Sequence, residues 1–268
     1  PWPSIAIQIV DGFGQPVAPY YFMKRTYEPT HVALDLPRLL WKSGETVGLK
    51  ARISNAVAAL AGTKVSVEVY DDHFKQVYKE EKYTDIPEGA SVTDAGLGSY
   101  TIPSDYKNKY LFMVAELNDA TGNLISRSFY YPRVLNIMDD TAFYTKYLAE
   151  PIPWVTLEKG PWLKPTVGKT STSLSVKLIS SIPSNNSTTN IQLTVKNTGK
   201  IPAFMTTVDI IGAKRIFYAS DNYFWLSPGE EKTIRMNVSY RENIPGKIVE
   251  VTVNAFNTKE IKIQLSKK

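Results

Sequence analysis

Hydrophobic and polar residues alternate along most of the chain from about Glu28 onward. In the stretch TVGLKARISNA, apolar Val47, Leu49, Ala51 and Ile53 are separated by polar or small residues. This is the period of a strand that buries one face. Similar runs follow one another, separated by the Gly, Pro, Asn and Asp residues that favour turns. The pattern therefore predicts an all-β chain built from antiparallel sandwiches.

The alternating runs fall into two groups. The first covers residues 28–133 and contains predicted hairpins around DDH and NDATGN. The second covers residues 165–268 and contains SLSVKLISS, EKTIRMNVSY and IVEVTVNAFN. Between them, residues 134–164 carry several prolines and no sustained period, which is typical of a connector. The two groups share an architecture, but no repeat of fixed period relates their sequences.

The first 27 residues have a different pattern. The apolar run IAIQIV reads as a strand, and a turn containing GFG follows it. Ala18, Tyr21, Phe22 and Arg25 then fall at helical spacing, which predicts a helix over residues 18–27. The chain is thus expected to begin with a strand-and-helix unit before its two sandwiches.

The composition is that of a globular protein, with 43% hydrophobic and 21% charged residues. The net charge of +5 is spread along the chain without a dense Lys/Arg block, so a nucleic acid is not the expected partner. The absence of cysteine excludes disulfides, thiolate metal sites and a cysteine nucleophile. No apolar run reaches the roughly 18–20 residues that a membrane span needs. These features are compatible with a bacterial protein located outside the cytoplasm.

Residues with catalytic or metal-binding chemistry are scattered rather than clustered. The two histidines, His31 and His73, have no second imidazole or cysteine nearby, so neither a metal nor a cofactor is expected. Neighbouring carboxylates occur in pairs, but adjacent side chains of a strand point to opposite faces and do not form an acid/base pair. These pairs are Asp71–Asp72, Glu80–Glu81, Asp139–Asp140 and Glu230–Glu231. No catalytic constellation is predicted.

Aromatic residues give the best candidates for ligand contact. In SDNYFWLSPGE, Tyr223 and Trp225 would share one face of a strand, as the exposed aromatic platforms of sugar-binding modules do. Packing in the core or an interface is the alternative interpretation, and it is the more common one. Trp2 lies between two prolines in PWPS and suits either a pocket wall or a filled gap.

Three landmarks resemble the C-terminal region of family 2 glycoside hydrolases, in particular exo-β-D-glucosaminidases and mannosylglycoprotein endo-β-mannosidases. The opening stretch is similar to the end of their catalytic barrel. LISRSFYYPRV is similar to the strand that ends the following sandwich, and RIFYASDNYFWLSPGEEKTI to the last domain. The matching residues of the opening stretch are Trp2-Pro3, Asp11, Phe13, Tyr20-Tyr21, Lys24 and Glu28-Pro29.

This resemblance implies that residues 1–27 are the last strand and helix of a (β/α)₈ barrel. Residues 28–133 and 165–268 would then be two Ig-like sandwiches at the end of a longer enzyme. The intact enzyme would hydrolyse a β-glycosidic bond with retention of configuration. Both catalytic glutamates would lie upstream, so the chain alone is expected to be inactive and no catalytic residue is assigned. Trp2 would lie near the sugar-binding end of the barrel. Relatives often carry an aromatic residue around Ile7, a departure that leaves the sugar open.

The resulting hypothesis is an accessory region that braces the barrel and shapes the rim of its active site. Its partner would be the missing barrel of the same protein and, through the whole enzyme, a β-linked glycan. A pair of carbohydrate-binding modules is one alternative, suggested by four aromatic residues. These are Trp154, Trp162, Tyr223 and Trp225. An array of Ig-like domains with a structural or adhesive role is another alternative.

Overall fold

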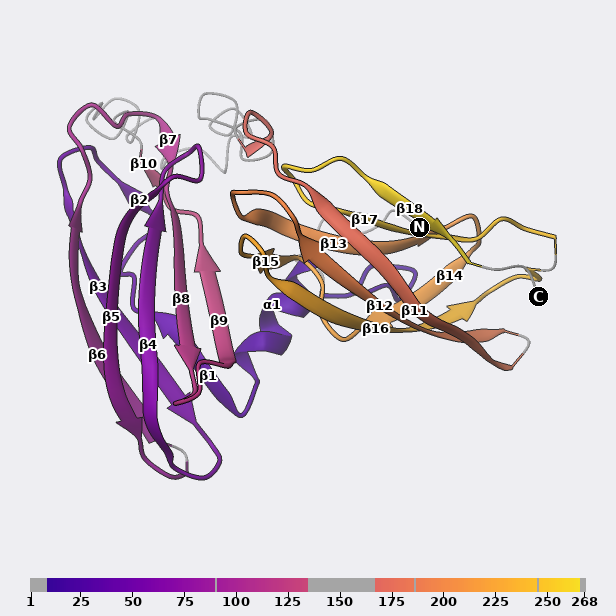
Figure 1. The fold of residues 1–268 in the computed structure, drawn as a ribbon, viewed down its shortest axis with the longest axis horizontal. Helices are drawn as coiled ribbons and strands as arrows, with labels where there is room; N and C mark the ends of the chain where they lie inside the picture. Colours follow the sequence, from indigo (N-terminus) through magenta and orange to yellow (C-terminus); the bar gives the residue numbers. More distant parts are fainter. Residues whose placement is uncertain (1–8, 90, 135–166, 186, 245, 266–268) are drawn as a thin grey trace. The chain divides into compact units, whose positions relative to one another are not determined.

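The computed structural model of the chain describes residues 9–89, 91–134, 167–185, 187–244 and 246–265. These residues are almost entirely β-structure with one short helix, α1, at Ala18–Thr26 (Figure 1). The chain divides into two compact units, one formed by residues 27–167 and the other by residues 1–26 together with 168–268. The predicted all-β class with β-sandwich domains is confirmed.

The first unit packs a three-stranded sheet, in the order β1-β3-β6, on a four-stranded sheet, β5-β4-β8-β9. A further small sheet has the order β2-β10-β7. The predicted alternation holds in β3, where Val47, Leu49, Ala51 and Ile53 are all buried in a single core between the large sheets. The strand bounds are β1 Thr30–Leu34, β2 Leu40–Trp41, β3 Thr46–Asn55, β4 Leu60–Tyr70, β5 Gln76–Ile86, β6 Ser91–Thr101, β7 Lys109–Tyr110, β8 Phe112–Asn118, β9 Leu124–Tyr130 and β10 Arg133–Val134.

The second unit packs two four-stranded sheets, β11-β12-β16-β14 and β15-β13-β17-β18, which form separate layers in Figure 1. Their inner faces enclose a second hydrophobic core, and Tyr21 of α1 belongs to it. We call this pair of sheets the C-terminal sandwich. Its strands are β11 Leu174–Asn185, β12 Thr188–Asn197, β13 Ala203–Ile211, β14 Arg215–Ala219, β15 Phe224–Leu226, β16 Glu231–Tyr240, β17 Glu250–Asn254 and β18 Ile261–Gln264.

The described segment before α1 is short and consists mainly of a turn. Val10 and Pro16 form an isolated antiparallel bridge, and the Asp11 side chain accepts hydrogen bonds from the backbone N–H groups of Phe13 and Gln15. We call residues 9–26 the N-terminal segment. At nine residues α1 is too short to span a bilayer, and no helix among the described residues is long and apolar enough to do so.

Parts of the sequence prediction fall outside the described residues. Residues 1–8 include Trp2 and most of the predicted first strand, and residues 135–166 are nearly all of the predicted connector, including Trp154 and Trp162. The assignment of residues 1–27 to a barrel and the predicted domain boundaries therefore stay predictions.

Candidate functional site

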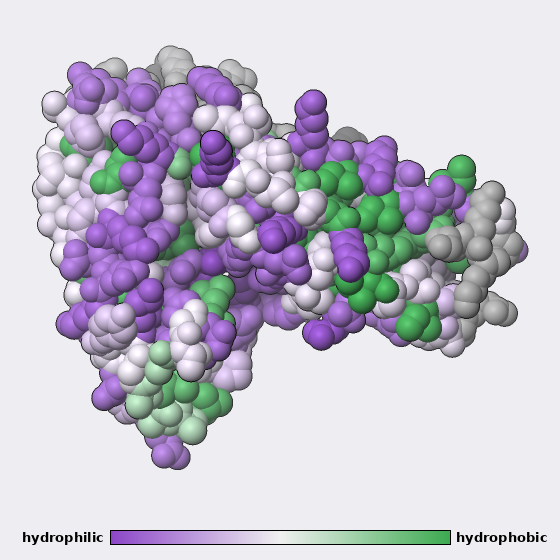
Figure 2. Space-filling model, in the orientation of Figure 1, coloured by the Kyte–Doolittle hydropathy of each residue, from purple (hydrophilic) through white to green (hydrophobic). Residues whose placement is uncertain are grey.

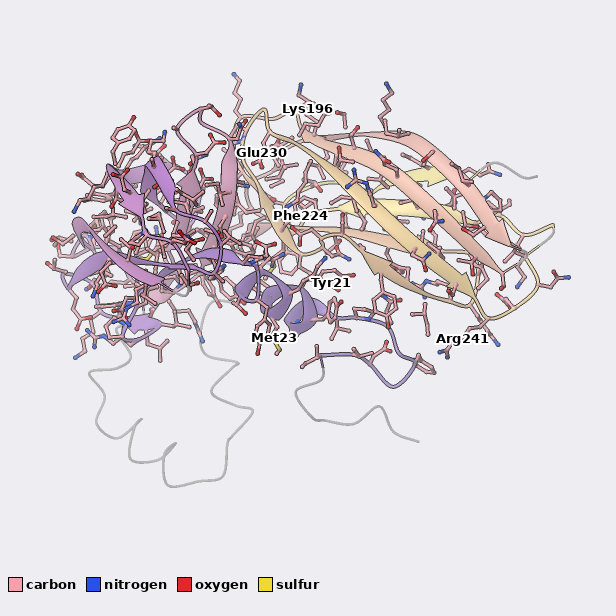
Figure 3. All side chains as sticks on the ribbon, turned by 90° about the horizontal axis from the view of Figure 1, so that it is seen from below. Tyr21, Met23, Lys196, Phe224, Glu230 and Arg241 are labelled. Carbon is pink, nitrogen blue, oxygen red and sulfur yellow. The ribbon has the colours of Figure 1, made fainter. Side chains whose placement is uncertain are left out.

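Helix α1 is held against the C-terminal sandwich by a buried tyrosine. Tyr21 has no exposed surface, and its hydroxyl accepts a hydrogen bond from the backbone N–H of Ala219 at 3.2 Å. Burial raises the pKa of Tyr21 to about 12, with the hydrogen bond to Ala219 acting in the opposite direction. Figure 3 shows Tyr21 directed from α1 toward the strands, with Met23 on the other side of the helix. A helix of nine residues is marginal alone, so this packing is what stabilises it.

The same contact covers an open sheet edge. Strand β14 is the last of its sheet among the described strands, so one side of its backbone has no strand partner there. The side-chain amide of Gln15 makes two hydrogen bonds to this edge. It donates to Phe217 O and accepts from Phe217 N, each at 3.0 Å. With the Tyr21 hydroxyl on Ala219 N, three outward-facing backbone groups of β14 are satisfied. Unpaired edges invite pairing with other chains, so covering them protects the fold.

Charged side chains fix the C-terminal end of α1. Arg25 pairs with Asp221 at 2.5 Å, and both side chains are only about one eighth exposed, at 13% and 12%. The Arg25 guanidinium also donates to the carbonyls of Asn222 and Tyr223, at 3.1 and 3.2 Å. Lys232 of β16 binds the second carboxylate oxygen of Asp221 at 2.5 Å. Charge-assisted bonds of this kind are about twice as strong as neutral ones.

We call these contacts the helix clamp. It joins Gln15, Tyr21 and Arg25 of the N-terminal segment to Phe217, Ala219 and Asp221 of the C-terminal sandwich.

The loop that carries Asp221 is shaped from within by Asn222. Its buried side chain accepts from Val208 N at 2.9 Å and donates to Val208 O at 3.0 Å, so it pairs with β13 as a strand would. Tyr223 follows with a φ of 53°, a left-handed conformation that costs a bulky residue energy. The Arg25 bond to Tyr223 O and the Asn222 bond to Tyr223 N offset that cost.

The two aromatic residues singled out from the sequence have different environments. Trp225 is 1% exposed, packs edge-to-face on Phe204 with ring centroids 6.2 Å apart, and donates from Nε1 to Ser227. Its ring offers no face to a ligand in this structure. Tyr223 is half-buried and reaches the surface. Strand β15 begins only at Phe224, so Tyr223 and Trp225 do not share a strand face.

A cavity of about 640 Å³ lies beside the helix clamp, between the N-terminal segment and the C-terminal sandwich. Its walls include aromatic side chains of Phe13, Phe217 and Tyr223. Its charged lining consists of Asp11, Asp209, Lys214, Arg215 and Arg241.

A second hollow, of about 490 Å³, crosses the outer face of the sheet β11-β12-β16-β14. The strand register lines its residues up in two rows. The first row runs Ile182, Asn190, Asn237 and Tyr218, and the second runs Ser180, Gln192 and Arg235. Tyr218 is 48% exposed and Ile182 61%. Figure 2 shows hydrophobic side chains on the visible face of this sandwich. Ile179 of β11 is also exposed.

Residues that could hold a metal do not gather in the structure. Among the described residues, no three side chains of His, Asp or Glu come together as a ligand set.

The comparison with known protein families concerns the C-terminal sandwich. Residues 167–258 match the family model described as the exo-β-D-glucosaminidase Ig-fold domain. The C-terminal sandwich is therefore similar to the exo-β-D-glucosaminidase Ig fold. The resemblance predicted from the sequence is therefore confirmed. Comparison with curated protein sequences gives no match for the chain.

Solved structures of glycosidases resemble the chain over nearly its whole length. The exo-β-D-glucosaminidase CsxA, in an inhibitor study, superposes with a TM-score of 0.69 at 18% identity, over 99% of this chain and 30% of that one. The exo-chitosanase CsxA of Amycolatopsis orientalis gives 0.67 at 17% identity, over 98% and 30%. A β-D-mannosidase from Dictyoglomus thermophilum gives 0.53 at 17% identity, over 96% and 25%. At this identity the likeness shows the fold, and the chain spans about 30% of the length of CsxA.

The sequence analysis singled out Tyr21 and the stretch that holds Phe217, Ala219 and Asp221 by their resemblance, but it did not predict that they contact one another. The spacing of Tyr21 and Arg25 marks one helix face, but nothing in the sequence names its partner 200 residues away. Gln15 was not singled out, and Asn222 only as part of the landmark stretch, because the role of each depends on which backbone edge it meets.

Proposed function

We propose that this chain is the C-terminal accessory region of a retaining β-glycosidase of the glucosaminidase or mannosidase type. In this proposal α1 is the last helix of the catalytic barrel, and the C-terminal sandwich braces it. The catalytic glutamates belong to the barrel upstream, so the chain alone is inactive. We place the enzyme outside a bacterial cytoplasm, which suits a protein without cysteine.

The helix clamp is the observation that carries this proposal. A helix that needs a buried tyrosine, an ion pair and an edge-covering amide is built to stay attached to the sandwich. The other side of the N-terminal segment is apolar and uncovered: Ile9, Val10 and Met23 are 36–39% exposed. The rest of the barrel would cover these residues.

The position of Gln15 links the brace to the active site. In a (β/α)₈ barrel, the loops that follow the strands form the catalytic face. Residues 11–17 are such a loop, since they follow the predicted last strand and precede α1. By holding Gln15 on β14, the sandwich would fix the rim of the active site.

The test uses the whole polypeptide that contains this chain. We expect Asp221→Ala to speed thermal inactivation of β-glycosidase activity, measured with aryl β-D-glucosaminide and β-D-mannoside, because Arg25 and Lys232 lose their shared carboxylate. The matched control is Glu116→Ala, which removes the similarly buried Glu116–Arg127 pair of the first unit, at 2.7 Å. If both variants inactivate at the same rate as each other, or if neither substrate is hydrolysed at all, the proposal is wrong.

The hollow on the outer sheet face supports a second candidate, a glycan-binding role. Amide side chains offer a donor and an acceptor together, and an exposed ring can stack on a sugar face. Asn190, Gln192 and Asn237 supply the amides and Tyr218 the ring, all from neighbouring strands. Calorimetric titration with chitosan and mannan oligosaccharides tests this role. Binding should be lost in Tyr218→Ala and kept in Tyr83→Ala, which removes a 72% exposed tyrosine of the first unit.

A further inference from the structure

We propose that the cavity beside the helix clamp binds a sugar-sized ring that carries an anionic group, either a carboxylate or a sulfate. The proposal does not depend on the bracing role, because the cavity belongs to one compact unit and its residues need no barrel. Neither the family match nor the similar structures assign a ligand to this place.

The size and walls of the cavity suit a small ring. Ligand pockets typically enclose about 300–1,000 Å³ and combine apolar walls with a few polar groups. At about 640 Å³ this cavity lies within that range. Of its aromatic residues, Phe13 belongs to the N-terminal segment and Tyr223 to the sandwich. Aromatic faces of this kind pack on the C–H face of a sugar.

The two carboxylates of the cavity are already engaged. Asp209 accepts on Oδ1 from Arg215 Nη2 at 2.5 Å and from the N–H of Ile210 at 2.7 Å. Asp11 uses its Oδ1 within its own turn, accepting from two backbone N–H groups at 2.9 Å. Both carboxylates are therefore occupied within the protein, and three cations, Lys214, Arg215 and Arg241, line the same cavity.

The cations are only partly satisfied. Arg215 bonds Asp209 through one nitrogen, while its buried Nε has no partner among the described residues. No acceptor within the described part of the chain binds the side chains of Lys214 or Arg241. A buried donor without a partner is unfavourable, and an acceptor supplied by a ligand would relieve that cost.

Arg241 is placed to meet a ligand at the mouth of the cavity. Its Nη2 lies 3.7 Å from the point where a side chain on Gly14 would begin. Figure 3 shows it at the end of the sandwich next to the N-terminal segment. The planar guanidinium binds carboxylate or sulfate through two parallel hydrogen bonds. A neutral ring would leave these donors unpaired, and a cationic amino sugar would be repelled.

The experiment is a calorimetric titration of the full chain at low salt, with four sugars of one ring size. The probes are D-glucuronate, D-glucose 6-sulfate, D-glucose and D-glucosamine. We expect saturable binding of at least one anionic sugar in the millimolar range, at least tenfold tighter than glucose and glucosamine. The first two arms decide whether the preferred group is a carboxylate or a sulfate. Binding should weaken as salt is added, because the cations lie near the surface.

Two substitutions locate the binding. Arg241→Glu and Lys214→Glu should each weaken the anionic sugar at least tenfold, and both side chains are exposed, so the fold should tolerate them. Lys196→Glu, at an exposed lysine of β12 that lines neither the cavity nor the second hollow, is the matched control and should change nothing. Glucose binding as tightly as the anionic sugars would overturn the proposal. So would the absence of saturable binding, an equal loss in the control, or inorganic sulfate binding as tightly as the sugars.

Discussion

Each sandwich has a buried asparagine at the end of a strand, bonded to an upstream threonine, but the two sandwiches cover their sheet edges differently. In the first unit, buried Asn55 ends β3, accepts from Thr30 Oγ1 at 2.8 Å and donates to the carbonyls of the following turn. In the second, buried Asn197 ends β12, accepts from Thr172 Oγ1 at 2.9 Å and donates to Ile201 O and Leu226 O. In each pair the threonine and the asparagine are separated by 25 residues along the chain. The turn chemistry of the fold is thus repeated although the sequences around it are not.

The edges differ in where their covering groups come from. In the first unit, β1 donates Val32 N to Ser126 and Leu34 N to the hydroxyl of Tyr130, both from β9 of the same unit. In the second unit, β14 is covered by Gln15 and Tyr21, about 200 residues upstream. One sandwich is complete within its own continuous stretch of chain, and the other depends on a distant segment. Dependence of this kind is what the proposed bracing role would require.

The largest expected difference between the two units is produced by Tyr21→Ala. Removing a fully buried aromatic side chain costs about 3–5 kcal/mol, because its contacts are lost and a cavity remains. Hydrogen exchange followed by mass spectrometry should show faster exchange in residues 168–268 and unchanged exchange in residues 27–134. Equal acceleration in both units would show that the N-terminal segment is not specific to the second.

The shared asparagine predicts a symmetrical effect. Asn55→Ala and Asn197→Ala should each lower the free energy of unfolding of their own unit by about 2–4 kcal/mol, because several buried groups lose their partner. Urea unfolding monitored by exchange within each unit measures this. A large effect in one unit and none in the other would contradict an equivalent role.

Alkaline pH should affect the second unit through Tyr21. Its pKa lies at about 12 in the folded chain against an ordinary value of 10.0, so the folded state favours the neutral phenol. The resulting stabilisation is complete below pH 10 and is lost as the pH rises toward 12, amounting to about 2–3 kcal/mol. The unfolding free energy of Tyr21→Phe should therefore fall less steeply across this window than that of the wild type. Parallel slopes would contradict the assignment to Tyr21.

The smallest expected effect is the loss of one hydroxyl hydrogen bond from either of the two edge-covering tyrosines. Tyr21→Phe and Tyr130→Phe each remove one hydroxyl from a strand N–H, at 3.2 and 3.1 Å. Each should cost its own unit about 1 kcal/mol, the typical net worth of such a bond. Melting of each variant, with exchange to assign the affected unit, measures the difference. A cost in the wrong unit would contradict the pairing described here.

The strands were predictable because their information is local. Alternation in β3 places Val47 and Ile53 on one face whatever lies opposite, and the helical spacing of Tyr21 and Arg25 marks α1 in the same way. The site was not predictable, because it depends on which residues meet. Tyr223 and Trp225 looked equivalent by period, yet a left-handed φ at Tyr223 breaks the period and Trp225 is buried. An amide such as Gln15 gains its role only from the edge it reaches.

The reach of Gln15 to Phe217, a separation of 202 residues, also sets an order of assembly. A ribosome makes about 5–20 residues per second, so the two groups appear roughly 10–40 s apart. Domains fold as units as they emerge, and the intervening sandwich can do so during this interval. During synthesis the segment of α1 stays without its packing partner, with Tyr21 uncovered, until β14 and the strands around it have left the ribosome. Joining the N-terminal segment to β14 is therefore a non-local step, of the kind that slows folding.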